Sequence, residues 1–298
     1  MKKVIFDCDN TMGVPNRDVD DGLTLLYLLG RKDINILGVT TTFGNSTIDI
    51  VHSNTIEMFQ ELNLQHIPLH KGAASPRNRQ SDASIFLLET VKNNPGEITL
   101  LATGSLTNLY GAYQLDNKFF SYVKEIVLMG GITEPLVING KNLDELNFAS
   151  DPEASYHVLS SGAKVTVLTG HICLQAFFGR DEYKRLMENP SIKIYQYIKE
   201  KTLPWFEFIM EEFGIEGFYN WDVVAAVYIN HPEIFVENSL PIISLPQDLK
   251  RGFLKVDTLA SNSYRVNVPT KIQDINIFNE VVFNSWENAD IFLNTDRG

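Results

Sequence analysis

The chain has 298 residues, of which 44% are hydrophobic and 21% are charged, a mixture typical of a globular protein with a sizeable core. Its 37 acidic and 25 basic residues give a formal net charge of −12, which disfavours binding to nucleic-acid backbones. Two cysteines, Cys8 and Cys173, are too few for a disulfide framework or a zinc site. Neither a signal-peptide core nor an apolar run of about 20 residues stands out. We therefore expect a cytoplasmic protein that binds neither nucleic acid nor a membrane.

Short runs rich in Val, Ile and Leu alternate with longer amphipathic runs. The runs predicted as strands are Val4–Asp7, Ile36–Thr41, Ile98–Thr103, Glu125–Met129 and Lys164–Thr169. The runs predicted as helices are Asp21–Leu29, Ile48–Leu62, Ala83–Asn93 and Asp151–Ser160. This alternation predicts an α/β fold with a Rossmann-like, mostly parallel sheet and helices on both faces. We expect one domain over residues 1–298, with a helical insertion from about Asp181 to Phe213 and short antiparallel strands between 242 and 268.

Polar residues and glycines follow the predicted strands. They are Asp7 to Asn10, Thr42 to Asn45, Thr103 to Ser105, Gly130 with Gly131, and Gly170 with His171. Ligands of open α/β sheets bind at the carboxyl ends of the strands. The sequence therefore predicts a ligand site at this edge of the sheet.

The amino-terminal segment carries five aspartates within fifteen positions: Asp7, Asp9, Asp18, Asp20 and Asp21. Asp20 and Asp21 precede an apolar run, so they should occupy the first turn of a helix, where the helix dipole favours acidic groups. Capping does not explain Asp7 and Asp9 at the end of a strand. Carboxylates gathered there would repel one another unless a cation bound them, and oxygen ligands favour Mg²⁺ or Ca²⁺ over zinc.

One resemblance is short. The string FDCDNT at 6–11 resembles the DxDxT motif of haloacid-dehalogenase-type phosphatases, which would make Asp7 a nucleophile and a Mg²⁺ ligand. It covers one strand and its turn. Such phosphatases also need a Lys and a distal acidic pair after later strands. Lys124 precedes its predicted strand, and no late GDxxxD-like string occurs.

A second resemblance runs from residue 3 to about 230. The aspartates resemble the DxDPGxDDA signature of calcium-dependent nucleoside hydrolases of the inosine–uridine-preferring type, with one insertion within 10–19. The strings that follow in the family's order are GVTTTFGN at 38–45, TGSLTN at 103–108, VLMGG at 127–131, ELNF at 145–148 with DPEA at 151–154, and WD at 221–222. The intervals from Asp9 to Asp20 and from Asp9 to Asn45 exceed the family's by the same length, so the one insertion accounts for both.

The resemblance implies hydrolysis of the N-glycosidic bond of a ribonucleoside to ribose and free base. By the match, Ca²⁺ is bound by Asp9, Asp21, Asp222 and the main-chain carbonyl of Thr103. Asp9 also matches the general base that takes a proton from the calcium-bound water. Asp20 should accept a hydrogen bond from a ribose hydroxyl.

Further positions match residues that contact the ribose or the attacking water. They are Asn45, Met129, Asn139, Glu145 and Asn147. Asp7 should support the ligands from behind. A polar surface loop would also explain Asn139, and a core position would explain Met129. Asp151 and Glu153 more simply cap the helix that they begin.

Trp221 departs from the pattern, because many family members carry a catalytic His before the late Asp. A Trp cannot protonate a leaving base but can stack on one, as in the purine-specific branch, so the resemblance implies a purine preference. His171 and His70 are alternative acids, although structural roles explain each of them. The insertion contains Arg17 and Asp18, which could close over the pocket or alter its selectivity.

The missing His also leaves open a nucleoside- or ribose-binding protein that has lost turnover. The resemblance further implies a homodimer or homotetramer.

Overall fold

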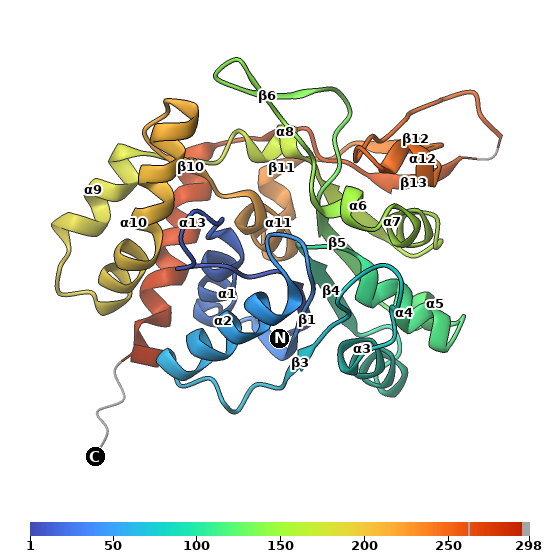
Figure 1. Ribbon diagram of the computed structural model, residues 1–298, viewed down its shortest axis with the longest axis horizontal. Helices are drawn as coiled ribbons and strands as arrows, with labels where there is room; N and C mark the ends of the chain where they lie inside the picture. The colour runs from blue at the N-terminus through green and yellow to red at the C-terminus, as the bar shows by residue number, and fades with distance from the viewer. Residues whose placement is uncertain (262, 294–298) are drawn as a thin grey trace.

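The computed structural model describes residues 1–261 and 263–293, which are organised around one eight-stranded sheet (Figure 1). The strand order is β12-β13-β8-β5-β4-β1-β2-β3. These strands are β1 (Lys2–Cys8), β2 (Ile34–Thr41), β3 (Leu69–Lys71), β4 (Ile98–Ala102), β5 (Glu125–Met129), β8 (Val165–Leu168), β12 (Ser239–Ile242) and β13 (Tyr264–Asn267). Neighbouring strands pair in parallel, except that β12 runs antiparallel to β13.

Small antiparallel pairs and helices surround this sheet. The pairs are β6 (Leu136–Ile138) with β7 (Lys141–Leu143), β9 (Phe177–Phe178) with β10 (Phe218–Tyr219), and β11 (Phe235–Val236) with β14 (Lys271–Ile272). The helices are α1 (Asp20–Gly30), α2 (Ile48–Glu61), α3 (Asp82–Asn93), α4 (Thr107–Leu115), α5 (Phe119–Tyr122), α6 (Asn147–Ser150), α7 (Pro152–Leu159), α8 (Gly170–Cys173), α9 (Arg180–Glu188), α10 (Lys193–Phe213), α11 (Trp221–Asn230), α12 (Pro246–Leu249) and α13 (Ile275–Asn288). Two 3-10 turns are η1 (Pro232–Ile234) and η2 (Ala289–Leu293).

The central strands are buried on both faces. Along β1, Val4 and Phe6 join a core with α1, α11 and α13, whereas Ile5 joins a second core with α3, α4 and α7. Alternate side chains of a strand point to opposite faces, so a strand covered by helices on both sides is apolar throughout. This is why the parallel strands are continuous Val, Ile and Leu runs.

The fold class predicted from the sequence is confirmed, and each predicted strand and helix ends within two residues of the observed element. The expected late helical stretch is α9 and α10. Between 242 and 268 the antiparallel pair of β12 and β13 is present, but the short helix α12 lies between the two strands. The sequence analysis missed α13, whose buried Trp286 donates a hydrogen bond from Nε1 to the Leu23 carbonyl at 3.0 Å.

The sheet order places the ends of β1 and β4 at the predicted ligand edge. From β1 the chain builds outward to β2 and β3 on one side and to β4, β5 and β8 on the other. Such a change of direction leaves a crevice at the carboxyl ends of the two strands. Asp9 follows β1 there, and Thr103 follows β4. Among the described residues, every helix is too short or too polar to cross a membrane.

Candidate active site

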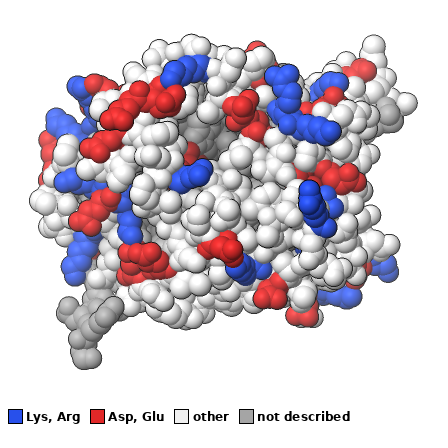
Figure 2. Space-filling view, viewed as in Figure 1, with Lys and Arg blue, Asp and Glu red and all other residues white. Residues whose placement is uncertain are grey.

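A pocket opens at this carboxyl edge, and Figure 2 shows the hollow with acidic and basic side chains near its rim. Its polar floor comes from the ends of strands and the first turns of α1 and α11. The floor residues that line it are Asp20, Asn45, Thr103, Met129, Asn147 and Asp222. Its apolar wall is lined by Trp205, Ile209, Phe213, Ile215, Phe218, Tyr219 and Trp221.

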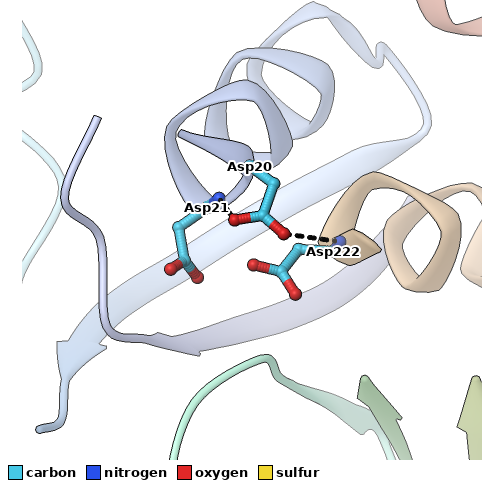
Figure 3. Close-up of side chains that lie close together, drawn as sticks. All are labelled: Asp20, Asp21 and Asp222. Atoms are coloured by element: carbon cyan, nitrogen blue, oxygen red, sulfur yellow. Dashed lines mark hydrogen bonds between the residues drawn. The ribbon is translucent and has the colours of Figure 1, made fainter. Parts of the chain in front are cut away.

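Three buried carboxylates meet at the floor (Figure 3). Asp20 and Asp21 form the first turn of α1, and Asp222 lies in the first turn of α11. One carboxylate oxygen from each lies within 4.8 Å of the others. The Asp222 main-chain N–H donates to Asp20 Oδ2 at 3.3 Å, which ties the two helix ends together. Residues about 200 positions apart are thus juxtaposed in one site.

Asp9 lies beside this cluster and is fully buried. Its carboxylate accepts hydrogen bonds from the Asn45 main-chain N–H at 2.5 Å and the Asn45 side-chain amide at 3.3 Å. A Cβ at Gly44 would stand 1.9 Å from Asp9 Oδ2, so only glycine fits this approach. The position of Asp9 is therefore fixed by the turn after β2.

Thr103 links the floor to the next loop. Its hydroxyl donates to Asp21 Oδ1 at 2.6 Å, and its carbonyl accepts from the Asn147 side-chain amide at 2.8 Å. Asp21 Oδ2 is buried and has no hydrogen-bond partner among the described residues. A buried carboxylate oxygen without a partner is costly unless a bound group satisfies it.

Burial disfavours the charged form of these carboxylates. It raises the pKa of Asp9 and of Asp20 to about 6, and the charge of Asp9 adds to the shift at Asp20. Burial, and then repulsion from neighbouring aspartates, raises the pKa of Asp21 and Asp222 well above the usual range. A bound cation would relieve this repulsion, so the donor set and the unsatisfied oxygen both fit a metal ion with hard oxygen ligands.

Asp7 lies behind the floor and does not line the pocket. Its Oδ1 accepts from the Thr40 hydroxyl at 2.5 Å and from the Asn108 side-chain amide at 2.7 Å. Burial raises its pKa to about 7, against the lowering effect of these two hydrogen bonds. A phosphatase of the DxDxT type would need this carboxylate to face its substrate, and here it is buried outside the pocket lining with its Oδ1 bound to Thr40 and Asn108.

The sequence of the chain matches the model of one protein family. The family is described as "Inosine-uridine preferring nucleoside hydrolase", and its model matches residues 4–280. The chain belongs to this family. It is therefore a nucleoside hydrolase, an enzyme that acts on N-glycosyl bonds, as the sequence analysis predicted.

Two curated relatives of this nucleoside hydrolase have names that state an activity. Uridine nucleosidase 1 of Arabidopsis thaliana is 28% identical over 285 residues, which cover 86% of this chain and 79% of the relative. Pyrimidine-specific ribonucleoside hydrolase RihB of Escherichia coli strain SE11 is 24% identical over 261 residues, or 78% and 79% of the two chains.

Solved structures share the fold. The plant nucleoside hydrolase PpNRh1 superposes with a TM-score of 0.84 at 20% identity, covering 96% of this chain and 98% of that one. The purine-preferring ribonucleoside hydrolase of Gardnerella vaginalis has a TM-score of 0.83 at 21% identity, covering 97% and 100%.

The predicted ribose contacts are only partly brought together in this hydrolase. Asn147, Met129 and Glu145 line the pocket. Glu145 also accepts three main-chain N–H bonds, from Gly131 at 3.0 Å, Phe148 at 2.8 Å and Ala149 at 2.9 Å. Burial raises its pKa against the effect of these bonds. Its carboxylate therefore holds the loop in addition to bordering the pocket.

Asn139 is not among the residues that line the pocket. It occupies the exposed turn between β6 and β7 with a φ of 46°, and its side chain donates to the Phe213 carbonyl at 2.7 Å. The position of Asn139 in this structure therefore agrees with the alternative explanation, a polar residue of a surface loop. Asp151 does cap α7, since its side chain accepts from the Ala154 N–H at 3.1 Å.

The two histidines considered as alternative acids, His70 and His171, lie outside the pocket lining. His70 stacks on Phe86 with ring centroids 4.2 Å apart, and His171 on α8 lies 3.9 Å from Glu134. Gln175 donates to the Thr270 carbonyl at 3.0 Å and accepts from the Ile272 N–H at 2.9 Å.

Sequence reasoning found Trp221 but missed the part of the apolar wall that α10 contributes. Trp205, Ile209 and Phe213 all line the pocket and stand four residues apart on α10. Residues with this spacing share one face of a helix, so the pattern itself contained the signal.

Proposed function

We propose that this nucleoside hydrolase is a Ca²⁺-dependent ribonucleoside N-ribohydrolase with Asp9 as its general base. The observation that supports it best is the convergence of Asp20, Asp21 and Asp222 at the floor of a pocket whose wall is aromatic. A ribose has hydroxyls for such a floor, and a nucleobase has a flat ring for such a wall.

The carboxylates of Asp9, Asp21 and Asp222, with the Thr103 carbonyl, would hold the ion. When bound, Ca²⁺ supplies positive charge that gathers ribose hydroxyls and lowers the pKa of a coordinated water. The unpartnered Asp21 Oδ2 and the repulsion among the buried carboxylates support this assignment.

The remaining roles follow from the hydrogen bonds of the floor. Asp9, held by both donors of Asn45, takes a proton from the attacking water. Asp20 accepts a hydrogen bond from a ribose hydroxyl, while the bond that its Oδ2 accepts from the Asp222 N–H joins α1 to α11. The carboxylates also stabilise the positive charge that develops at the sugar carbon as the N-glycosidic bond breaks. Asn147 and Met129 border the sugar.

The base is proposed to stack on Trp221, which implies a preference for purines. Trp221 lines the pocket, and its ring centroid lies 5.2 Å from that of Tyr219. A larger base offers more surface to such a wall. A pyrimidine preference is the second candidate, because the curated relatives named above are a uridine nucleosidase and a pyrimidine-specific hydrolase.

The decisive experiment measures reducing-sugar release from inosine, guanosine, adenosine, uridine and cytidine. The protein is stripped with EDTA and then assayed with and without added Ca²⁺. We expect release only with the ion and the highest kcat/KM with a purine nucleoside. Tight binding without any sugar release would instead identify a binding protein, and full activity in EDTA would refute the metal assignment. Light scattering of the same sample tests the predicted homodimer or homotetramer.

A further inference from the structure

The proposed function leaves one chemical need unmet, and the inference that follows rests on that function. When the N-glycosidic bond breaks, its electron pair passes to the base. Trp221 has only an indole N–H, and His70 and His171 lie outside the pocket lining. Another group must stabilise the charge on the leaving base.

The insertion after β1, within residues 10–19, is a loop that hydrogen bonds and packing hold in place. The Thr11 hydroxyl donates to the Asp18 carbonyl at 2.8 Å and closes its base. The Asn54 side-chain amide donates to the carbonyls of Asn10 and Met12, at 3.3 and 3.2 Å. Buried Met12 packs so closely on α1 that a Cβ at Gly22 would stand 2.3 Å from its sulfur. These contacts fix the direction in which the tip of the loop extends.

The tip extends to the aromatic wall. A Cβ at Gly13 would stand 3.0 Å from the side chain of Lys201 on α10, the helix that also carries Trp205 and Ile209. Asn16, with a φ of 56°, Arg17 and Asp18 then line the pocket. The loop and α10 therefore border the same pocket, and the base would lie between them and the floor.

Arg17 is the one cationic side chain among the described residues that line the pocket. The carboxylates that line it are Asp18, Asp20, Asp144, Glu145 and Asp222. No ion pair of the Arg17 guanidinium occurs among the described residues, and the residue is exposed. Its five N–H groups are thus available to a ligand at the pocket mouth.

We propose that Arg17 stabilises the leaving base by donating hydrogen bonds to a ring carbonyl oxygen. As the C1′–N bond breaks, the electron pair enters the base, and the negative charge spreads to oxygens such as O6 of hypoxanthine or O2 of uracil. Arg17 keeps its protons, because a guanidinium does not deprotonate near neutral pH. Water adds its hydroxyl to the sugar and its proton to Asp9. The base then takes a proton from solvent, and Asp9 returns its own to solvent.

Two substrates with different leaving groups test the proposal. A nucleoside needs help for its base to depart, whereas 4-nitrophenyl β-D-ribofuranoside releases a stable anion without help. We expect Arg17→Ala to lower kcat about 10- to 100-fold with inosine and uridine, the range for a lost hydrogen bond to a charged group. With the nitrophenyl riboside the change should stay below about 3-fold. Arg17→Lys should restore part of the loss because it retains the charge.

Matched variants separate this role from others. Lys32→Ala removes a cation from the exposed turn before β2, at the opposite edge of the sheet, and should leave both substrates unaffected. Equal losses with both substrates in Arg17→Ala would overturn the proposal, because they would indicate a role in the ribose site or in folding. A leaving-group-dependent loss in Tyr219→Phe or Asp18→Asn, with none in Arg17→Ala, would assign the role to those side chains instead.

An additional assay with a nucleotide tests whether Arg17 recognises a phosphate instead. If wild type hydrolyses inosine 5′-monophosphate and Arg17→Ala loses that activity alone, Arg17 binds a phosphate and the proposal is wrong. The proposed function has a separate outcome: wild-type protein with Ca²⁺ that releases ribose from neither the nucleosides nor the nitrophenyl riboside would refute the hydrolase mechanism itself.

Discussion

The floor and the wall of the pocket are built in different ways. Five residues at the floor or directly beneath it, Asp9, Asp20, Asp21, Thr103 and Asp222, are each 3% exposed or less, and all follow strands or begin helices packed against the sheet. The wall is built from one face of α10 and from residues between 215 and 221, the insertion borders the same pocket, and several of these side chains are partly exposed. The sheet edge thus holds the proposed reacting groups, and peripheral segments border the place proposed for the base.

This contrast suggests that the floor determines the reaction at the ribose and that the wall determines which base is preferred. Groups that act on the ribose must keep one geometry, which buried strand ends provide. Groups that contact the base can vary without disturbing the sheet, because α10 and the insertion lie outside it. Changes to the buried carboxylates of the floor should therefore lower turnover strongly with every nucleoside, whereas changes in the wall should alter the ranking of bases.

The strongest test of this contrast removes Asp9. Asp9→Ala should lower kcat about 10²- to 10⁴-fold with every base, because the attacking water loses its general base. Asp9→Asn should lose nearly as much while keeping the shape of the side chain. Stopped-time assays of sugar release with saturating Ca²⁺ measure both variants.

Asp144→Asn is the control, since it removes one exposed negative charge from the pocket lining, whereas Asp9 is buried beside the floor. It should change kcat less than about 3-fold if position matters more than total charge. Activity of Asp9→Ala within a few-fold of wild type would show that another group is the base.

Trp221→Ala tests the wall. We expect kcat/KM to fall about 10-fold or more with inosine and less with uridine, because stacking on an aromatic side chain is worth roughly 1–3 kcal/mol per base. Trp221→Phe should retain part of the preference. Equal losses with the two nucleosides would remove the case for stacking, and a larger loss with uridine would favour the pyrimidine preference.

The floor was largely predictable from the sequence. Asp9 and Thr103 lie at the ends of apolar runs that are predicted as strands, and Asp20 and Asp21 precede an apolar helix. Parallel strand ends meet at one edge, so proximity followed from the fold class. What placed Asp222 beside them was the resemblance to a family, because spacing within the chain does not relate α11 to α1.

The wall was less predictable because its position depends on tertiary packing. The stripe of Trp205, Ile209 and Phe213 could equally have faced the core, and periodicity alone does not say which surface a helix faces. The insertion has no regular period, so its contacts with α10 were not visible either. Asn139 matched a motif, yet the chain around it forms a hairpin whose turn points its amide to Phe213.

The third prediction concerns pH and metal removal. Burial raises the pKa of Asp9 and Asp20 from 3.8 to about 6 and that of Asp7 to about 7. A carboxyl that binds its proton more tightly when folded stabilises the protein below pH 4, and this stabilisation is lost as the pH rises through 6 to 7. The metal-free protein should therefore lose free energy of unfolding, on the order of a few kcal/mol, between pH 5 and pH 8.

Added Ca²⁺ should raise Tm more at pH 8 than at pH 5, because the ion binds deprotonated carboxylates. Differential scanning fluorimetry with EDTA or Ca²⁺ measures both effects. Asp222→Asn removes one of the clustered carboxylates, so it should flatten the pH dependence and weaken the response to Ca²⁺. A calcium shift of equal size at both pH values, in wild type, would contradict the assignment of the ion to this floor.

The smallest expected effect concerns two of the predicted ribose contacts, Asn147 in the floor and Asn139 in the exposed hairpin. Asn147 donates to the carbonyls of Thr103 and Met129, at 2.8 and 3.1 Å, so Asn147→Ala should disturb the floor and raise KM about 10-fold. Asn139 instead ties an exposed hairpin to the end of α10, so Asn139→Ala should change KM less than about 3-fold. Asn139→Gly keeps the left-handed backbone accessible and separates the turn from the side chain. If Asn139→Ala raised KM as much as Asn147→Ala, with Tm unchanged, the hairpin would have to move onto the ribose during binding, and part of the wall would then belong to the catalytic floor.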